Sequence, residues 1–301
     1  MIVADLSLAD LRKRLATQGL AVNVGPFKCQ IKSKLAAVSE HIHLLYADAI
    51  IDPEPEFTDF PIEISRSGGL RHWFKPQAIF TFNGTVPFTP LPLDQAAALL
   101  EWGINWCVSA HAHQYLIFHA AVVEKNDRAI IMPAPSGSGK STLCAGLVGR
   151  GWRLLSDELT LLATDDSRIH GFAKPISLKN ASINIIKEFW PAAVCGELCN
   201  DTQKGTVAHL KPPAGSMADA KVPASPAFVI FPKYLASGSC QLTPQEKGQA
   251  FMALVENAFN YHLLGVAGFR ALQRVIDEVD VFDFEYSDLE QAIDVFESLV
   301  K

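Results

Sequence analysis

The sequence predicts an α/β fold built on a mixed sheet, and three observations lead to it. A glycine-rich loop at residues 134–142 stands between an apolar run and a helix-prone segment. Two strand-like runs before it flank a short polar tip, which indicates a β-hairpin, and helical patterns fill the C-terminal part. A strand, a loop and a helix in this order are typical of nucleotide-binding α/β proteins, whereas the hairpin predicts a sheet that is not wholly parallel.

Residues 1–92 are expected to form a small mixed or β-rich N-terminal region. A helical pattern covers residues 6–20, and residues 42–47 and 78–82 have the pattern of strands. The many prolines between residues 53 and 92 argue against a mainly helical unit. We expect this region to be a scaffold, with substrate recognition as the alternative.

Residues 93–301 are expected to form a second, larger domain. A helix is predicted at residues 93–111, and the hairpin strands at residues 115–123 and 128–133. After the loop, a helix ends near Gly149 and Gly151, which can adopt the backbone conformation that terminates helices. Further strands are predicted at residues 152–155, 160–163, 228–231 and 281–284.

The remaining segments are a long connection and a helical end. Residues 211–226 are rich in proline, and connections of this kind are often lids or disordered segments. Helices are predicted at residues 248–279 and from Asp288 onward, where Ser287 and Glu290 have the spacing of a capping box.

The loop at residues 134–142 reads Ala-Pro-Ser-Gly-Ser-Gly-Lys-Ser-Thr, and it predicts a nucleoside triphosphate site of the Walker A type. Glycines let backbone N–H groups turn toward phosphate oxygens, and the following helix adds its positive N-terminal end. Lys140 would reach the β- and γ-phosphates and Ser141 would bind Mg²⁺. The strict pattern begins with Gly, so Ala134 narrows the loop by a methyl group. The residues expected to contact the nucleotide are Pro135, Ser136, Gly137, Ser138, Gly139, Lys140, Ser141 and Thr142.

Two acids follow the next predicted strand. A short helix, a turn and a returning strand separate Lys140 from Asp157, so a strand paired beside the loop strand would bring its terminal acids to the phosphates. Adjacent side chains on a strand face opposite ways, and we therefore predict different roles for the two acids. Asp157 is predicted to activate or orient the acceptor hydroxyl, and Glu158 to bind the metal. The alternative is a solvated turn with a capping Asp.

Histidines and lysines provide further candidates. His119 lies in an apolar strand, where it is either an active-site group or a satisfied core residue. His209 precedes the proline-rich connection and could reach a substrate. Lys174 and Lys179 would supply positive charge to a phosphoryl group, or they are solvated surface residues.

Three of these segments together resemble the HPr kinase/phosphorylase group, whose fold is shared with ATP-dependent phosphoenolpyruvate carboxykinase. They are residues 118–123, the loop, and residues 151–158. Most of the chain from about residue 93 onward is similar to the HPr-kinase-related kinase A family. The segments that carry this closer resemblance are residues 101–106, 177–180 and 260–265.

The resemblance implies an ATP- and Mg²⁺-dependent kinase that transfers the γ-phosphoryl group to a hydroxyl, as on a serine of a protein or peptide. Lys140 and Ser141 would be the phosphate and Mg²⁺ ligands, Asp157 the activating acid and His119 its active-site partner. Asp157 and Glu158 stand where HPr kinases have two Asp residues, so HPr itself is not implied as the acceptor. A small-molecule (sugar or metabolite) kinase and a non-catalytic, nucleotide-dependent binding module are the alternatives. The expected nucleotide is ATP, because no guanine-specific Asn-Lys-x-Asp tetrapeptide stands near the loop.

The composition limits the classes of molecule that the chain is expected to bind. The chain has 26 basic and 32 acidic residues and a net charge of −6, without a dense basic run, which argues against nucleic acid. No uninterrupted apolar run approaches the ~18 residues of a membrane span, and the scattered cysteines suit a reducing cytoplasm. The expected partners are therefore a nucleotide, a protein, peptide or small-molecule hydroxyl acceptor, and a second copy of the chain.

Overall fold

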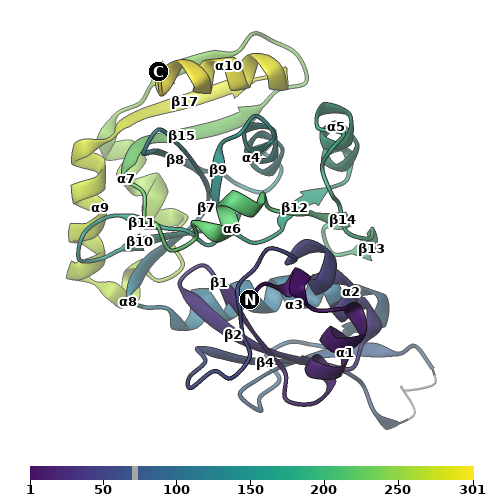
Figure 1. Ribbon diagram of the computed structural model, residues 1–301. Coiled ribbons are helices and arrows are strands. Elements are labelled where there is room, and N and C mark those ends of the chain that lie inside the picture. Colours follow the sequence, from purple (N-terminus) through teal and green to yellow (C-terminus); the bar gives the residue numbers. More distant parts are fainter. Residues whose placement is uncertain (70–73) are drawn as a thin grey trace.

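The computed structural model describes residues 1–69 and 74–301, which fold into an α/β protein with mixed sheets (Figure 1). The expected α/β class with a mixed sheet is thereby confirmed. The N-terminal elements, in purple and blue, lie together at the bottom of the view, and the C-terminal elements, in green and yellow, lie above them. Among the described residues, no helix combines the length and the apolar character needed to cross a bilayer.

The N-terminal sheet has the strand order β3-β1-β2-β4-β5-β6, in which β2 and β4 are parallel and the other neighbours are antiparallel. Its strands are β1 (Leu20–Val24), β2 (Phe27–Ser33), β3 (Ile51–Asp52), β4 (Phe60–Arg66), β5 (Gln77–Phe82) and β6 (Leu91–Pro92). The helical elements in this part of the chain are η1 (Val3–Asp5), α1 (Leu8–Ala16), α2 (Ala36–Leu45), η3 (Leu93–Gln95) and α3 (Ala96–His111).

Three sequence predictions for this region have different outcomes. The helix at 6–20 is confirmed in part as α1, which begins after the capping residue Ser7 and ends at Ala16, before β1 starts at Leu20. The strand at 78–82 is confirmed as β5. The strand at 42–47 is wrong, because residues 42–45 form the last turn of α2. Val38, Ile42 and Leu45 are all buried at helical spacing, so the apolar residues there follow the period of a helix.

The larger sheet has the order β11-β10-β7-β8-β15-β17-β16, with β9 paired to β7 beside this path. The predicted hairpin is confirmed, because β7 and β8 are antiparallel neighbours. On the other side of β8 the pairing is parallel, first to β15 and then to β17. The strands are β7 (Tyr115–Lys125), β8 (Arg128–Pro133), β9 (Arg153–Ser156), β10 (Leu159–Ala163), β11 (Ile169–His170), β15 (Pro226–Tyr234), β16 (Gln241–Pro244) and β17 (Asp280–Tyr286).

The sequence suggested that the strand before the two acids pairs with the loop strand β8. The structure shows that it does not. β9 pairs antiparallel with β7 instead, with Leu154 opposite Val123. Both sides of β8 are already occupied, by β7 and by β15. Since β7 is antiparallel to both β8 and β9, these two strands run in the same direction and end at the same edge. The acids therefore still lie beside the loop.

A small sheet with the order β12-β14-β13 and several helices complete the chain. The small-sheet strands are β12 (Ile176–Lys179), β13 (Cys199–Thr202) and β14 (Gly205–Leu210). The helices after the loop are α4 (Lys140–Gly149), α5 (Ala181–Phe189), α6 (Ala214–Ala218), α7 (Lys247–Glu256), α8 (Tyr261–Leu264), α9 (Val266–Glu278) and α10 (Leu289–Leu299).

The proline-rich connection at 211–226 is an ordered segment, not a disordered one. It contains α6, and the Ser216 hydroxyl accepts a hydrogen bond from the backbone N–H of Leu154 at 2.9 Å. Further along, Ala224 and Ile169 exchange two backbone hydrogen bonds of 2.9 Å. Its prolines therefore shape a segment that packs against the edge of the larger sheet.

The helical end also differs in detail from the expectation. The predicted helix at 248–279 is broken into α7, α8 and α9, because the Asn260 side chain turns away to bind the backbone of β7. Gly265, with φ +53°, separates α8 from α9. The last helix is capped by Asp288, which accepts the Gln291 N–H at 2.9 Å, one residue after the predicted cap Ser287.

The buried apolar side chains fall into three clusters. One joins the N-terminal sheet and α3 to one end of β7 and β10, and the other two cover opposite faces of the larger sheet. Helices α4 and α10 contribute to one of these faces, and α7 and α9 to the other. Because α3 packs with the N-terminal sheet, it carries side chains from that region toward the loop. The division of the chain at residue 92 stays a prediction.

Candidate phosphate-binding site

The loop between β8 and α4 is shaped by its two glycines. Gly137 and Gly139 have φ values of +91° and +89°, a region that residues with a side chain rarely adopt. A Cβ on Gly139 would lie 2.3 Å from the Tyr286 hydroxyl, whereas one on Gly137 would meet no described atom within 4 Å. The Tyr286 hydroxyl donates to the Gly139 carbonyl at 2.9 Å, so glycine at 139 lets the loop rest against β17.

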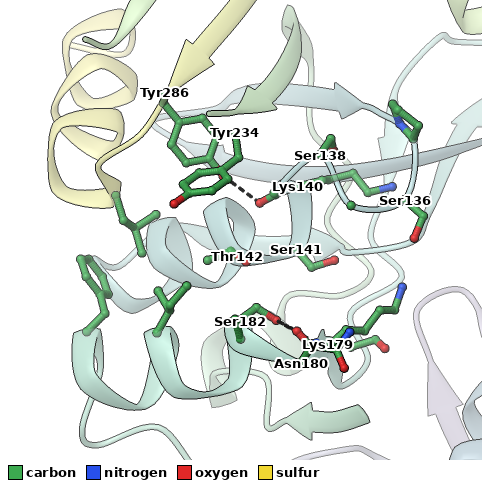
Figure 2. Close-up of a pocket in the computed structure, with 18 of the residues that line it drawn as sticks. Ser136, Ser138, Lys140, Ser141, Thr142, Lys179, Asn180, Ser182, Tyr234 and Tyr286 are labelled. Carbon is green, nitrogen blue, oxygen red and sulfur yellow. Dashed lines mark hydrogen bonds between the residues drawn. The ribbon is translucent and has the colours of Figure 1, made fainter. Parts of the chain in front are cut away.

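A cavity of about 740 Å³ opens in front of this loop (Figure 2). All the residues predicted to contact the nucleotide, 135–142, line it. From other elements come His119, Glu158 and Lys179, three of the predicted site residues. Asp157 and His209 are not among the lining residues. The structure thus brings most of the predicted site into one hollow and leaves two members behind its wall.

Lys140 and His119 contact each other directly. The Lys140 ammonium donates to His119 Nε2 at 3.0 Å, and it also lies 3.5 Å from the Ala134 carbonyl oxygen. Burial, and then the charge of Lys140, lower the pKa of His119 to about 4. Burial likewise lowers the pKa of Lys140, although Asp157 and Glu158 counteract it. His119 is therefore a neutral acceptor near pH 7, half-buried at the cavity wall.

Asp157 lies behind the loop and is 3% exposed. Its Oδ2 accepts the backbone N–H of Ser177 at 3.1 Å, and Oδ1 has no hydrogen-bond partner among the described residues. Burial and the charge of Glu158 raise the pKa of Asp157, while Lys140 and the Ser141 hydroxyl act in the opposite direction. A carboxylate oxygen without a partner, next to a serine hydroxyl, suits an oxygen-binding cation such as Mg²⁺.

Glu158 follows Asp157 in the turn between β9 and β10 and lines the cavity. Burial raises its pKa, but the charges of Lys174, Lys204 and Lys179 lower it by more. It is therefore ionised at neutral pH, at the cavity wall that His119 and Lys179 share. The expectation that the two acids face different surroundings agrees with these contacts, and their roles stay predictions.

Asn105 on α3 is a residue of the site that the sequence reasoning missed. Its amide donates to Glu158 Oε2 in a close contact, and its Oδ1 has no partner in the described part of the chain. One turn earlier on the same helix, Glu101 is 1% exposed and accepts from Lys174 Nζ at 2.9 Å. Glu101 and Asn105 are polar, stand four positions apart and have mostly apolar neighbours, and this spacing is the signal that could have revealed the face.

The remaining candidate site residues, Lys179, His209 and Lys174, differ in how deeply they are buried. Lys179 lines the cavity. His209 is 4% exposed on β14, with its ring centroid 5.4 Å from that of His41, and burial above all lowers its pKa to about 3. Lys174 is 4% exposed and paired with Glu101, so it is neither a cavity residue nor a solvated surface lysine. The role of His209 as a substrate contact therefore stays a prediction. In the small sheet, His209 of β14 pairs with Ser177 of β12.

Comparison with known proteins gives a partial match. Residues 98–176, from α3 through the loop to the start of β12, match a family described as “SynChlorMet cassette protein ScmC”. No curated protein matches the chain. Among solved structures, the Hpr(Ser) kinase/phosphatase from Coxiella burnetii is similar, with 12% sequence identity and a TM-score of 0.27. The match covers 61% of this chain and 93% of that one.

Proposed function

We propose that this chain is an ATP- and Mg²⁺-dependent kinase that transfers the γ-phosphoryl group to a hydroxyl. One observation carries the proposal: the glycine-rich loop with Lys140 and Ser141 lines a single cavity together with Glu158, and the buried Asp157 lies next to Glu158 behind the cavity wall. Phosphoryl transfer depends mainly on positioning and on neutralising the negative charge of the phosphates. These groups around one cavity can position the phosphates and neutralise their negative charge.

Nucleotide binding would begin with the loop. Its backbone N–H groups and the N-terminal end of α4 favour phosphate oxygens, and Gly137 leaves open space in front of them. The Lys140 ammonium would exchange its contact with His119 for oxygens of the β- and γ-phosphates. Because His119 is neutral, it can accept from Lys140 without opposing its charge.

The two acids would divide the remaining work. Ser141 and Asp157 would hold Mg²⁺, which neutralises phosphate charge when it is bound. Glu158 would accept the proton of the acceptor hydroxyl. This assignment reverses the one predicted from the sequence, and its support is that Glu158 lines the cavity, whereas Asp157 does not and interacts with the Ser141 hydroxyl.

A serine of a protein or peptide is the proposed acceptor. The support for this class is the resemblance of the chain to HPr-kinase-related kinases, since the cavity itself does not select among hydroxyls. His119, Glu158 and Lys179 line the end of the cavity where such a hydroxyl would approach the γ-phosphate.

Label transfer from γ-labelled ATP tests the proposal. The protein would be incubated with Mg²⁺ and peptide or lysate fractions, and labelled products identified by mass spectrometry. We expect Lys140→Ala to abolish nucleotide binding, because the loop loses its only movable positive charge. Asp157→Asn should retain most of the nucleotide affinity but lower transfer by about 100-fold, because Mg²⁺ would lose a charged ligand.

The exposed Lys34 in the N-terminal region provides a matched control, and Lys34→Ala should change neither quantity. Full transfer by the Asp157 variant would remove that residue from the mechanism. Tight binding of ATP by the wild type without label on any fraction would instead support a non-catalytic binding module.

A further inference from the structure

The cavity has two chemically different ends. Its polar lining residues His119, Glu158 and Lys179 come from β7, from the turn after β9 and from the end of β12, just before α5, whereas the apolar Ile185 and Phe189 lie in the middle and at the end of α5 and line the cavity together with residues at the start of α10. Because α5 leads away from Lys179 toward Phe189, we place these two sets at opposite ends. In Figure 2, α4 with Ser141 and Thr142 crosses the centre of the view, and α5 passes below it. The apolar end is therefore a groove beside α4, between α5 and α10.

The position of the loop determines which part of a nucleotide lies at each end of the cavity. In loops of this type the Lys reaches the β- and γ-phosphates and the Ser contacts the metal that bridges them. Lys140 lies against His119 and is close to both acids, so the γ-phosphate belongs at the charged end. The α-phosphate and the sugar must then leave past Thr142, which lies in the first turn of α4 and lines the cavity.

The groove has a defined floor and a closed far end. On α4, a Cβ at Gly146 would lie 2.9 Å from Leu289, and one at Gly149 would lie 3.1 Å from the Trp190 ring. These glycines let α10 and the end of α5 approach the helix closely. Beyond them, the Arg150 guanidinium lies 4.3 Å from the centre of the Phe189 ring and pairs with Glu290 of α10.

The lining of the groove suits a flat, uncharged ring. Ile185 is 41% exposed although it is a large apolar residue, and Leu289 is only partly buried. The lysines that line the cavity, Lys140 and Lys179, both lie toward the other end, whereas carboxylates from Glu188 and Asp288 reach this one. Carboxylates would repel a second anion but can accept hydrogen bonds from the amino group of a base.

We infer that the nucleobase of the bound triphosphate occupies this groove, with Ile185 and Leu289 against its faces. The inference rests on the proposed function, because the direction of the phosphates determines it. Adenine fits the chemistry, since its exocyclic amine is a donor to the carboxylates. The groove thereby becomes the part of the site that selects the nucleotide, while the loop holds any polyphosphate.

Calorimetry with Mg²⁺ and two probes, ATP and inorganic tripolyphosphate, separates the two parts. We expect the wild type to bind ATP more tightly than tripolyphosphate. Ile185→Ala removes apolar contact with the base alone, so it should weaken ATP binding about fivefold and leave tripolyphosphate affinity unchanged. Leu289→Ala should act in the same direction.

Val194→Ala is the matched control, since Val194 is 42% exposed and lies outside the cavity; it should leave both affinities unchanged. Equal affinity of the wild type for ATP and tripolyphosphate, or an equal loss of both in the Ile185 variant, would overturn the inference while leaving the phosphate site intact. Failure of the wild type to bind either probe would overturn the proposed function itself, and the inference with it.

Discussion

At the scale of single residues, the contact between Lys140 and His119 decides how the site responds to protons. A proton on His119 would face the Lys140 ammonium 3.0 Å away and would lose solvation inside the wall. Both effects favour the neutral imidazole. The same histidine in an unfolded chain would titrate near its ordinary pKa of 6.5.

Folding stability should therefore depend on pH through His119. Below pH 6.5 the unfolded chain takes up a proton that the folded protein refuses until about pH 4, so the free energy of unfolding falls as pH falls through this window. His119→Gln should remove on the order of 1–2 kcal/mol of that decline, allowing for solvent at the cavity wall. Urea unfolding at several pH values measures it.

The exposed histidine His262 on α8 supplies the control, because His262→Gln should leave the pH dependence as it is. His209 also makes the free energy of unfolding fall with falling pH, since burial lowers its pKa to about 3. Some decline should thus persist in the His119 variant, but an unchanged curve would contradict the assigned pKa.

At the scale of elements, α3 connects the N-terminal sheet with the acid that faces the cavity. Its buried face packs on the N-terminal core, and Asn105 holds Glu158 from that helix. Asn105 thus acts on the site through Glu158, as a positioning residue. The helix was predicted correctly from its apolar pattern, but the partner of Asn105 was not, because Glu158 follows a different strand far along the sequence.

Substitution of Asn105 should alter the rate without altering nucleotide affinity. We expect Asn105→Ala to lower phosphoryl transfer about tenfold, because Glu158 loses its donor. Asn105→Asp places a second carboxylate against Glu158 and raises the pKa of that acid. The acid limb of the pH–rate profile should then move to higher pH, a shift that a purely structural defect does not produce.

Ser109→Ala, one turn further along α3, serves as the control and should behave as the wild type. Its hydroxyl bonds only within the helix, to the Trp106 carbonyl, among the contacts of the described residues. A pH–rate profile of Asn105→Asp that coincides with the wild type would show that Asn105 does not act through Glu158.

Local patterns predicted the elements better than their pairing. The loop, the β7–β8 hairpin and α3 follow from turn residues and periodicity, which are properties of short segments. The errors have two physical sources. Residues 42–47 are too short an apolar run to separate a helix from a strand, and the partner of β9 depends on β15 occupying the far side of β8.

At the scale of the whole molecule, a buried ion pair joins the N-terminal part to the rest. Glu101 of α3 accepts from Lys174 at 2.9 Å and contacts His41 Nε2 at 2.7 Å, with the Glu101 and Lys174 side chains almost fully buried. Burial alone would lower the pKa of Lys174, yet Glu101 raises it. Both groups are therefore charged, and each depends on the other.

Removal of one partner should be costly. Lys174→Met leaves the Glu101 charge buried without its main counter-ion, and we expect a loss of about 3–5 kcal/mol in the free energy of unfolding. The exposed pair between Lys233 and Glu285 provides the comparison. Lys233→Met should change the free energy of unfolding far less, because solvent screens this exposed pair. Equal losses in the two variants, measured by urea unfolding, would contradict this account.

The hydrogen bond from Tyr286 to the Gly139 carbonyl also bears on how the protein is made. During translation, β8, the loop and α4 leave the ribosome long before β17 does. Until Tyr286 emerges, the loop lacks the ring against which Gly139 rests. A nascent chain should consequently acquire the proposed affinity for polyphosphates late in synthesis, so we expect a chain on a ribosome stalled ahead of β17 not to bind them.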